Sequence, residues 1–315
     1  MDISNIVTTQ VLIMFVLMLI GYLSIKLRAL SESTPKELST ILLNVVNPVV
    51  IFLSFQRKFE QTYLKGLLLS LALSAFAVII SVLAARLLIR QKAKGGSDET
   101  SIERFSAIYS NCGFMGIPLI QAVFGSDGVF YLSAFLAVFN IMVWTHGYLQ
   151  LAGNAKKPGM LKILFSPSLI AVYLGLICFI SQTSLAGFPL KTAEYISAIN
   201  TPLAMIVAGG MIASANLKRS LFNRSIWKTA FIRLVFIPLV LIICFGFMHV
   251  DSTVSLTVII VSAAPTAAVG TLMCVKLGKN FRYASEIFAF TTVASIVTIP
   301  LIVKLYALFS EVIFA

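Results

Sequence analysis

Charged residues are scarce in this sequence. Asp, Glu, Lys and Arg make up only 11% of the 315 residues, whereas hydrophobic residues make up 59%. Soluble domains carry about 25% charged and about 45–50% apolar residues. The apolar residues lie in long separate blocks rather than in one scattered core. This distribution excludes a single soluble domain.

Residues that build metal sites, disulfides and catalytic centres are also few. The two histidines and the few acids assemble into no Ser/His/Asp or metal cluster, and we find no phosphate-binding loop. The cysteines show no C-x-x-C spacing and lie inside apolar blocks, where they fit small apolar fillers; they are Cys112, Cys178, Cys244 and Cys274. We therefore expect no enzyme, no primary pump, no metal and no cofactor.

Ten apolar blocks of roughly 20 residues fill most of the chain, and each is long enough to cross about 30 Å of hydrocarbon. Backbone groups in lipid must hydrogen-bond within their own segment, so such blocks must be helices. The sequence predicts an all-α polytopic membrane protein with ten transmembrane helices. The predicted spans are Ile6–Leu27, Leu38–Phe55, Leu64–Ile89, Ile102–Phe124, Val129–Leu151, Leu161–Ser181, Leu190–Ala213, Trp227–Met248, Thr253–Leu277 and Ala284–Phe309. No basic segment follows Met1, so we expect no cleaved signal peptide.

The net charge of +12 has an uneven placement. If the N-terminus lies outside, 18 of the 24 Lys and Arg residues fall in cytoplasmic loops or helix ends and four in external loops. This bias follows the positive-inside rule, so we expect a lipid bilayer rather than nucleic acid as the partner. Both termini are then periplasmic. Arg57 and Lys58, in an external loop, are a local exception.

Two halves of five spans meet at the basic segment Ala155–Pro158, which predicts units 1–153 and 154–315. An odd number of spans per half forces the second half to enter from the opposite side, as in an inverted repeat. Pro48 and Pro202, each shortly after an asparagine, are 154 residues apart, and Asn111 and Thr266 are 155 residues apart. These near-equal offsets predict an inverted five-helix repeat.

The fourth and ninth spans combine Gly, Pro and small polar residues. Pro removes a backbone donor and Gly loosens a helix, so both spans are predicted to break at mid-membrane. The half-helix N-termini at two such breaks would face one point and bind an anion without Lys or Arg. The candidate site residues beside the breaks are Asn111, Thr266, Ser110, Cys112, Gly113 and Pro265. Two structural alternatives stay open, because Gly and Pro are common in membrane helices and Asn111 could instead join two helices.

Four further polar residues are weaker candidates, namely Asn47, Ser54, Asn200 and Thr201. They could face the site or only hold helix contacts. Arg233 and Lys304 fall within predicted spans, but by these boundaries the middle of every span lacks Asp, Glu, Lys and Arg. Proton-coupled carriers usually keep an ionisable group at that depth. The sequence therefore predicts electrogenic transport without proton coupling.

The stretch Asn111–Leu119, with Asn47-Pro48 and Ala264–Thr266, resembles the auxin efflux carrier family, whose prokaryotic members are commonly assigned as malate or malonate permeases. The resemblance covers nearly the whole chain. Plant relatives have a long central loop where this chain has about ten residues, so it looks like a bacterial member. The family has Pro-Asn where this chain has Ser110-Asn111, so the asparagine carries over and the proline does not.

The resemblance implies ten helices in two inverted repeats, similar in fold to sodium/proton antiporters and bile-acid symporters. It implies that the fourth and ninth helices cross at the substrate site. Helices 1, 2, 6 and 7 would form a scaffold that dimerises, and helices 3–5 and 8–10 a moving transport domain.

Together these expectations describe a secondary transporter of a small organic anion in the bacterial inner membrane, working by an elevator mechanism. The anion would be an auxin-, malate- or malonate-like carboxylate. Two alternatives are a sodium-coupled organic anion symporter and a membrane sensor that binds a ligand without transporting it. The inverted repeat makes a channel the least favoured reading.

Overall fold

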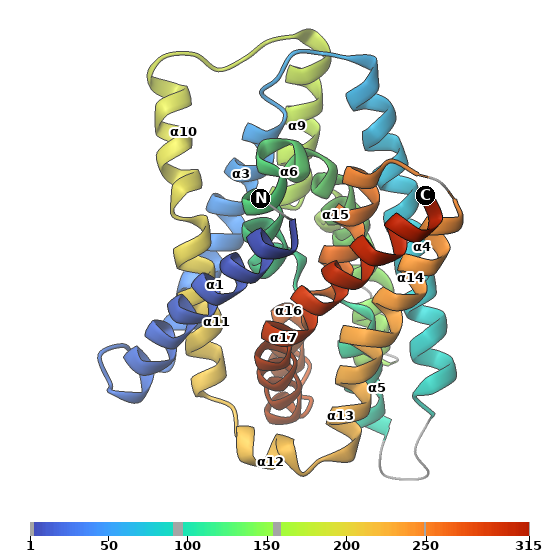
Figure 1. Cartoon of the computed structure of the whole chain (residues 1–315). Helices are drawn as coiled ribbons and strands as arrows, with labels where there is room; N and C mark the ends of the chain where they lie inside the picture. The colour runs from blue at the N-terminus through green and yellow to red at the C-terminus, as the bar shows by residue number, and fades with distance from the viewer. Residues whose placement is uncertain (1–2, 91–96, 154–158, 249, 315) are drawn as a thin grey trace.

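The computed structural model describes residues 3–90, 97–153, 159–248 and 250–314. Within these ranges every regular element is a helix, which confirms the all-α fold class (Figure 1). Seven helices in this part of the chain are long and apolar enough to cross a membrane, and Pro167–Ser181 and Ser252–Ala263 are shorter apolar helices. Ten crossings and the inverted repeat stay predictions. Residues 91–96 of the predicted cytoplasmic linker lie outside the described residues. The predicted boundary at 153–154 lies at the edge of a second range, 154–158, that is also outside them.

Each predicted span overlaps one or more of these helices. The first half consists of α1 (Ile3–Lys26), α2 (Thr34–Ile41), η1 (Leu42–Val46), α3 (Asn47–Ser54), α4 (Gln61–Leu88), α5 (Ser97–Ile108), η2 (Cys112–Gly116), α6 (Ile117–Met142), η3 (Val143–Gly147) and α7 (Tyr148–Ala152). The second half consists of α8 (Met160–Leu164), α9 (Pro167–Ser181), α10 (Phe188–Ala198), α11 (Asn200–Ala213), α12 (Leu217–Leu221), α13 (Arg224–Phe231), η4 (Ile232–Phe236), α14 (Ile237–Phe247), α15 (Ser252–Ala263), α16 (Ala268–Lys276) and α17 (Phe281–Phe314).

Three of the four π-helical turns have a proline two residues beyond their last residue. Pro48 follows η1, Pro118 follows η2 and Pro238 follows η4. A proline ring clashes with the carbonyl four residues earlier, and a wider turn makes room for it while the helix continues. These prolines therefore widen helices. The two interruptions of helical structure described below lie elsewhere.

The predicted turn between the fourth and fifth spans lies inside α6. Gly125 has φ 60° and ψ −144°, outside the helical region, and it divides α6 into two parts. Only glycine adopts such a conformation easily, which explains the residue type at this bend. Beyond the bend, the Asp127 carboxylate accepts a hydrogen bond of 2.8 Å from Arg57. This ion pair gives a structural role to Arg57, one of the two predicted external residues that depart from the positive-inside rule.

The helix ends separate into two groups in Figure 1. The basic helix α12, the start of α5 and the start of α17 lie toward one end of the bundle. The connection between α9 and α10 lies at the opposite end. Among the residues at the first end, Lys279 donates to Asp98 at 2.6 Å and the Arg219 Nε atom lies 4.0 Å from the Glu286 carboxylate. The basic helix α12 and the starts of α5 and α17 thus lie at the same end of the bundle.

Close backbone packing joins α1 to α11. A Cβ atom on Gly21 would lie 2.2 Å from the Ile206 carbonyl oxygen, and one on Gly209 would lie 1.9 Å from the Met18 carbonyl oxygen. Small residues permit this approach, which drives helix association in lipid. The pair links the first and seventh predicted spans, two of the four assigned to the scaffold, although the division into scaffold and transport domain stays a prediction.

Gly209→Ala is expected to lower the thermal unfolding midpoint of the purified protein. The new methyl group meets backbone rather than a flexible side chain, so α1 and α11 must separate, and such overpacking costs about 1–3 kcal/mol. Gly159→Ala is the control, because its Cβ atom meets nothing within 4 Å. An unchanged midpoint in Gly209→Ala would contradict the close packing.

Candidate functional site

Two non-helical segments run side by side where α5 and α15 end. We call this region the crossover; it consists of Tyr109–Asn111 and Ala264–Ala267. Ser110 and Thr266 form an antiparallel bridge. The Asn111 amide donates to the Pro265 carbonyl at 2.7 Å, and the Ala267 amide donates to the Tyr109 carbonyl at 2.8 Å. The crossover therefore pairs its own backbone groups although it lies outside a helix.

Local chemistry explains why each helix stops here. Pro265 lacks an amide hydrogen. Ala264 and Ala267, on either side of Pro265-Thr266, have extended ψ values of 151° and 126°. Asn111 has φ −79° and ψ 56°, and its carbonyl accepts the amides of Met115 and Gly116 at 3.0 and 3.1 Å. Asn111 thus ends one interruption and starts the next helix.

Four helix ends meet at the crossover. Helices α5 and α15 end there with their C-termini, and helix η2, which leads into α6, and helix α16 begin there with their N-termini. A helix N-terminus carries roughly +0.5 charge and a C-terminus roughly −0.5. The region therefore holds two positive and two negative ends at short range.

Three buried polar side-chain atoms at the crossover have no hydrogen-bond partner within the described structure. They are the Ser110 hydroxyl, the Asn111 amide nitrogen and the Thr266 hydroxyl. All three residues are buried, with Asn111 only 4% exposed. A buried unpaired donor costs roughly 1–3 kcal/mol, so these atoms call for an explanation. A ligand with acceptor oxygens would satisfy all three.

Asn47 and Asn200 also come together, as a buried side-chain pair. The Asn200 amide donates to the Asn47 carbonyl oxygen at 2.7 Å, and the Asn200 oxygen has no partner within the described structure. A Cβ atom on Gly113 would lie 3.2 Å from the Asn47 amide nitrogen. These two asparagines, from predicted spans 2 and 7, are thus hydrogen-bonded to each other beside the start of η2.

The remaining predicted residues have different surroundings. Cys112 is buried as the first residue of η2. Ser54 is buried at the far end of α3, where its hydroxyl donates to the Ile51 carbonyl at 2.6 Å. Thr201 is half-buried on α11. The structure therefore gathers Ser110, Cys112, Gly113, Pro265 and Thr266 around Asn111, brings Asn47 close to them, and places Ser54 in its own helix.

Arg233 is the important residue that the sequence analysis missed. It is 1% exposed, and its guanidinium donates to the carbonyls of Ala264, Ala107 and Ile108 at 3.1, 3.1 and 2.8 Å, and also to that of Ser262. The prediction that the middle of every span lacks charge is therefore wrong. The available signal was a lone arginine inside an apolar block, which is a functional hypothesis by default.

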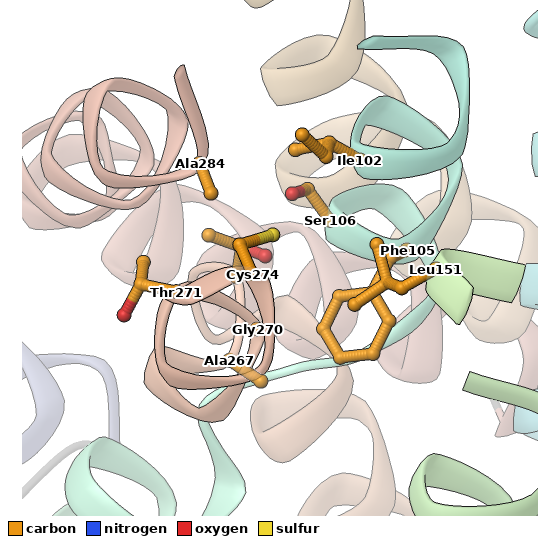
Figure 2. Close-up of a pocket in the computed structure, with 10 residues that line it drawn as sticks. Ile102, Phe105, Ser106, Leu151, Ala267, Gly270, Thr271, Cys274 and Ala284 are labelled. Carbon is orange, nitrogen blue, oxygen red and sulfur yellow. The ribbon is translucent and has the colours of Figure 1, made fainter. Parts of the chain in front are cut away.

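A small cavity adjoins the crossover, between α5, α16 and α17 (Figure 2). Thr266, Ala267 and Gly270 line it from one side, and Phe105 and Ser106 of α5 from the other. Its volume is about 10 Å³, room for about one water molecule. Ligand pockets usually measure roughly 300–1,000 Å³. The described conformation is therefore closed around this part of the crossover.

Apolar helices in this number, with a polar crossover buried among them, are typical of multi-pass membrane transport proteins. The membrane transport protein family matches residues 6–158 and 157–303. The chain belongs to this family, which is the auxin efflux carrier family that the motifs predicted.

Relatives agree with this assignment. An uncharacterized transporter of Methanothermobacter thermautotrophicus is 26% identical over 93% of this chain and 96% of its own. The uncharacterized transporter MJ1031 of Methanocaldococcus jannaschii is 24% identical over 67% of this chain and 71% of its own. The uncharacterized transporter YfdV of Escherichia coli K12 is 22% identical over 91% of this chain and 93% of its own. The family and these relatives indicate a multi-pass membrane transporter.

Proposed function

We propose that this protein is a secondary transporter of a small organic anion, with a carboxylate group bound at the crossover. One observation carries the proposal: two helix N-termini and three unpaired buried polar groups converge there. Hydroxyl and amide hydrogens are donors for a carboxylate, whose two oxygens accept several bonds. Asn111 and Thr266 would orient the anion from the two interruptions.

The charges at the crossover favour binding of a ligand with a single negative charge. The two C-termini contribute about −1 in total, which the Arg233 cation offsets. The two N-termini contribute about +1 in total. A carboxylate ligand, with one negative charge, would complete the balance.

Transport requires the closed crossover to open. The cavity beside Thr266 holds about one water, so an organic anion needs the surrounding helices to separate. We infer an elevator motion, in which predicted spans 3–5 and 8–10 carry the crossover past a scaffold of predicted spans 1, 2, 6 and 7. The close contact of α1 with α11 supports a firm scaffold. The two family matches meet at residues 157–158, close to the predicted boundary of two inverted halves.

The scaffold would also form a homodimer. The outer surfaces of α1 and α9 carry large exposed apolar side chains, among them Leu12, Val16, Leu174 and Ile177, which suit either lipid or a second copy. Native mass spectrometry from detergent would report the oligomeric state.

The proposed membrane is the bacterial inner membrane, with ten crossings and both termini periplasmic. A cysteine introduced at residue Ser97 should react with impermeant reagents only from the cytoplasm, and one at Ser252 only from outside. The charge bias and the common location of the basic helix ends support this orientation. Labelling of the cysteine at residue 97 in intact cells would contradict this orientation and indicate the opposite one.

The experiment that tests this function is a thermal-shift screen of the purified protein against mono- and dicarboxylates, with matched amides and alcohols as neutral controls. A ligand at 100 times its dissociation constant stabilises the folded state by about 2.7 kcal/mol. We expect stabilisation by a subset of carboxylates and none by their neutral analogues. Stabilisation by the neutral analogues alone would refute an anion site.

A further inference from the structure

Arg233 holds both interrupted helices at once. Its guanidinium donates to Ala107 and Ile108 at the end of α5, and to Ser262 and Ala264 at the end of α15. These two helix ends come from different halves of the chain. One cation therefore joins the two C-termini whose carbonyls would otherwise face each other unpaired.

Four converging carbonyl oxygens are also the kind of ligand set that a metal cation would take. Here the guanidinium occupies that set, because its five hydrogen-bond donors form a planar fork that can serve several carbonyls. Arg233 is 1% exposed, so its charge is shielded from solvent and is matched by the carbonyls instead.

We propose that Arg233 is a built-in cation that takes the place of a coupling ion at the crossover, so that anion binding and transport are independent of sodium. This inference rests on the proposed anion transport. Arg233 is a positioning residue in this account: it fixes the two interruptions so that Asn111 and Thr266 can meet the same anion. A sodium ion among these carbonyls would meet the guanidinium charge at contact distance and be repelled.

The first test uses the unaltered protein. The dissociation constant of the carboxylate found by thermal shift is measured in sodium chloride and in choline chloride at equal ionic strength. The expected difference is less than twofold. An increase in affinity of tenfold or more in sodium would overturn the proposal, because a second cation would then be required.

The second test removes the cation and returns it. Arg233→Ala is expected to weaken anion binding more than tenfold, and ethylguanidinium, which corresponds to the deleted part of the side chain, is expected to restore at least half of the loss on a logarithmic scale. Arg224→Ala is the control, since Arg224 is exposed on the preceding helix α13. It should bind normally and ignore ethylguanidinium.

Two results of the second test would overturn the proposal: normal binding in Arg233→Ala, or a folded variant whose loss ethylguanidinium does not reduce. If Arg233→Ala does not fold, Arg233→Lys keeps the charge with fewer donors. We expect it to bind more weakly than the unaltered protein and still without sodium. A sodium requirement for anion binding in Arg233→Lys would again contradict the proposal.

Failure of the proposed function is distinguishable from failure of this inference. If no carboxylate stabilises the protein, the anion proposal fails, and Arg233 is still tested by unfolding. The midpoint of the unaltered protein should be the same in sodium and choline, and ethylguanidinium should raise the midpoint of Arg233→Ala only. A higher midpoint for the unaltered protein in sodium would show a separate cation site.

Discussion

Asn111→Ala is expected to weaken anion binding by about 1.5–3 kcal/mol, roughly 10–150-fold, while the protein stays folded. The Asn111 amide nitrogen is buried without a partner at the start of η2, so its removal breaks no hydrogen bond within the described structure. The substitution should therefore lower the affinity for the ligand and leave the stability of the fold unchanged. Isothermal titration of the ligand, with unfolding midpoints measured in parallel, separates the two effects.

Asn140→Ala is the matched control for this substitution. Asn140 lies on α6, and its side-chain amide donates to the Leu136 carbonyl of the same helix at 2.8 Å, so this polar group already has a partner within the protein. Its replacement should leave the affinity unchanged. Thr266→Val keeps the side-chain shape and tests the second interruption separately. Normal affinity in Asn111→Ala would assign Asn111 to packing and remove the basis of the site.

An inside-negative membrane potential is expected to drive outward flux of the anion. Each net charge moved is worth about 2.3 kcal/mol per 100 mV, which corresponds to roughly a fiftyfold gradient at equilibrium. The Arg233 charge does not alter this result, because it would move with the crossover in one direction and return in the other. The net charge per cycle is that of the anion.

Proteoliposomes with potassium and valinomycin set the voltage for this measurement, and a pH gradient is imposed separately. We expect flux to follow voltage and to respond little to the pH gradient alone. His146, whose Nδ1 lies 2.8 Å from the Tyr109 hydroxyl, is the titratable group to control for. His146→Gln keeps a polar partner for Tyr109 and should behave like the unaltered protein. Flux that follows pH and ignores voltage would refute electrogenic transport.

The sequence predicted the helices well because lipid imposes simple rules. Length and hydropathy are one-dimensional signals, and they predicted the all-helical fold class. The paired offsets of Pro48 with Pro202 and Asn111 with Thr266 predict an inverted repeat, which stays a prediction. The structure adds which residues touch. The bridge between Ser110 and Thr266 joins positions 156 residues apart, and the asparagines at 47 and 200 share a hydrogen bond.

Arg233 shows why the rest could not be predicted. Its position in an apolar block was visible, but its partners are backbone carbonyls, which every residue carries and which no motif marks. Only the fold determines that the ends of α5 and α15 meet at this side chain. For the same reason Ser54 looked equivalent to Asn47 in the sequence, although its hydroxyl bonds within its own helix.

The central claim is that the crossover binds an anion and carries it across the membrane. Counterflow tests it most directly: proteoliposomes loaded with unlabelled carboxylate from the thermal-shift screen are diluted into a trace of the labelled compound. A carrier predicts transient accumulation of label inside, which Asn111→Ala should abolish at the same protein density. Binding of the carboxylate without any accumulation in the unaltered protein would contradict transport and indicate a sensor.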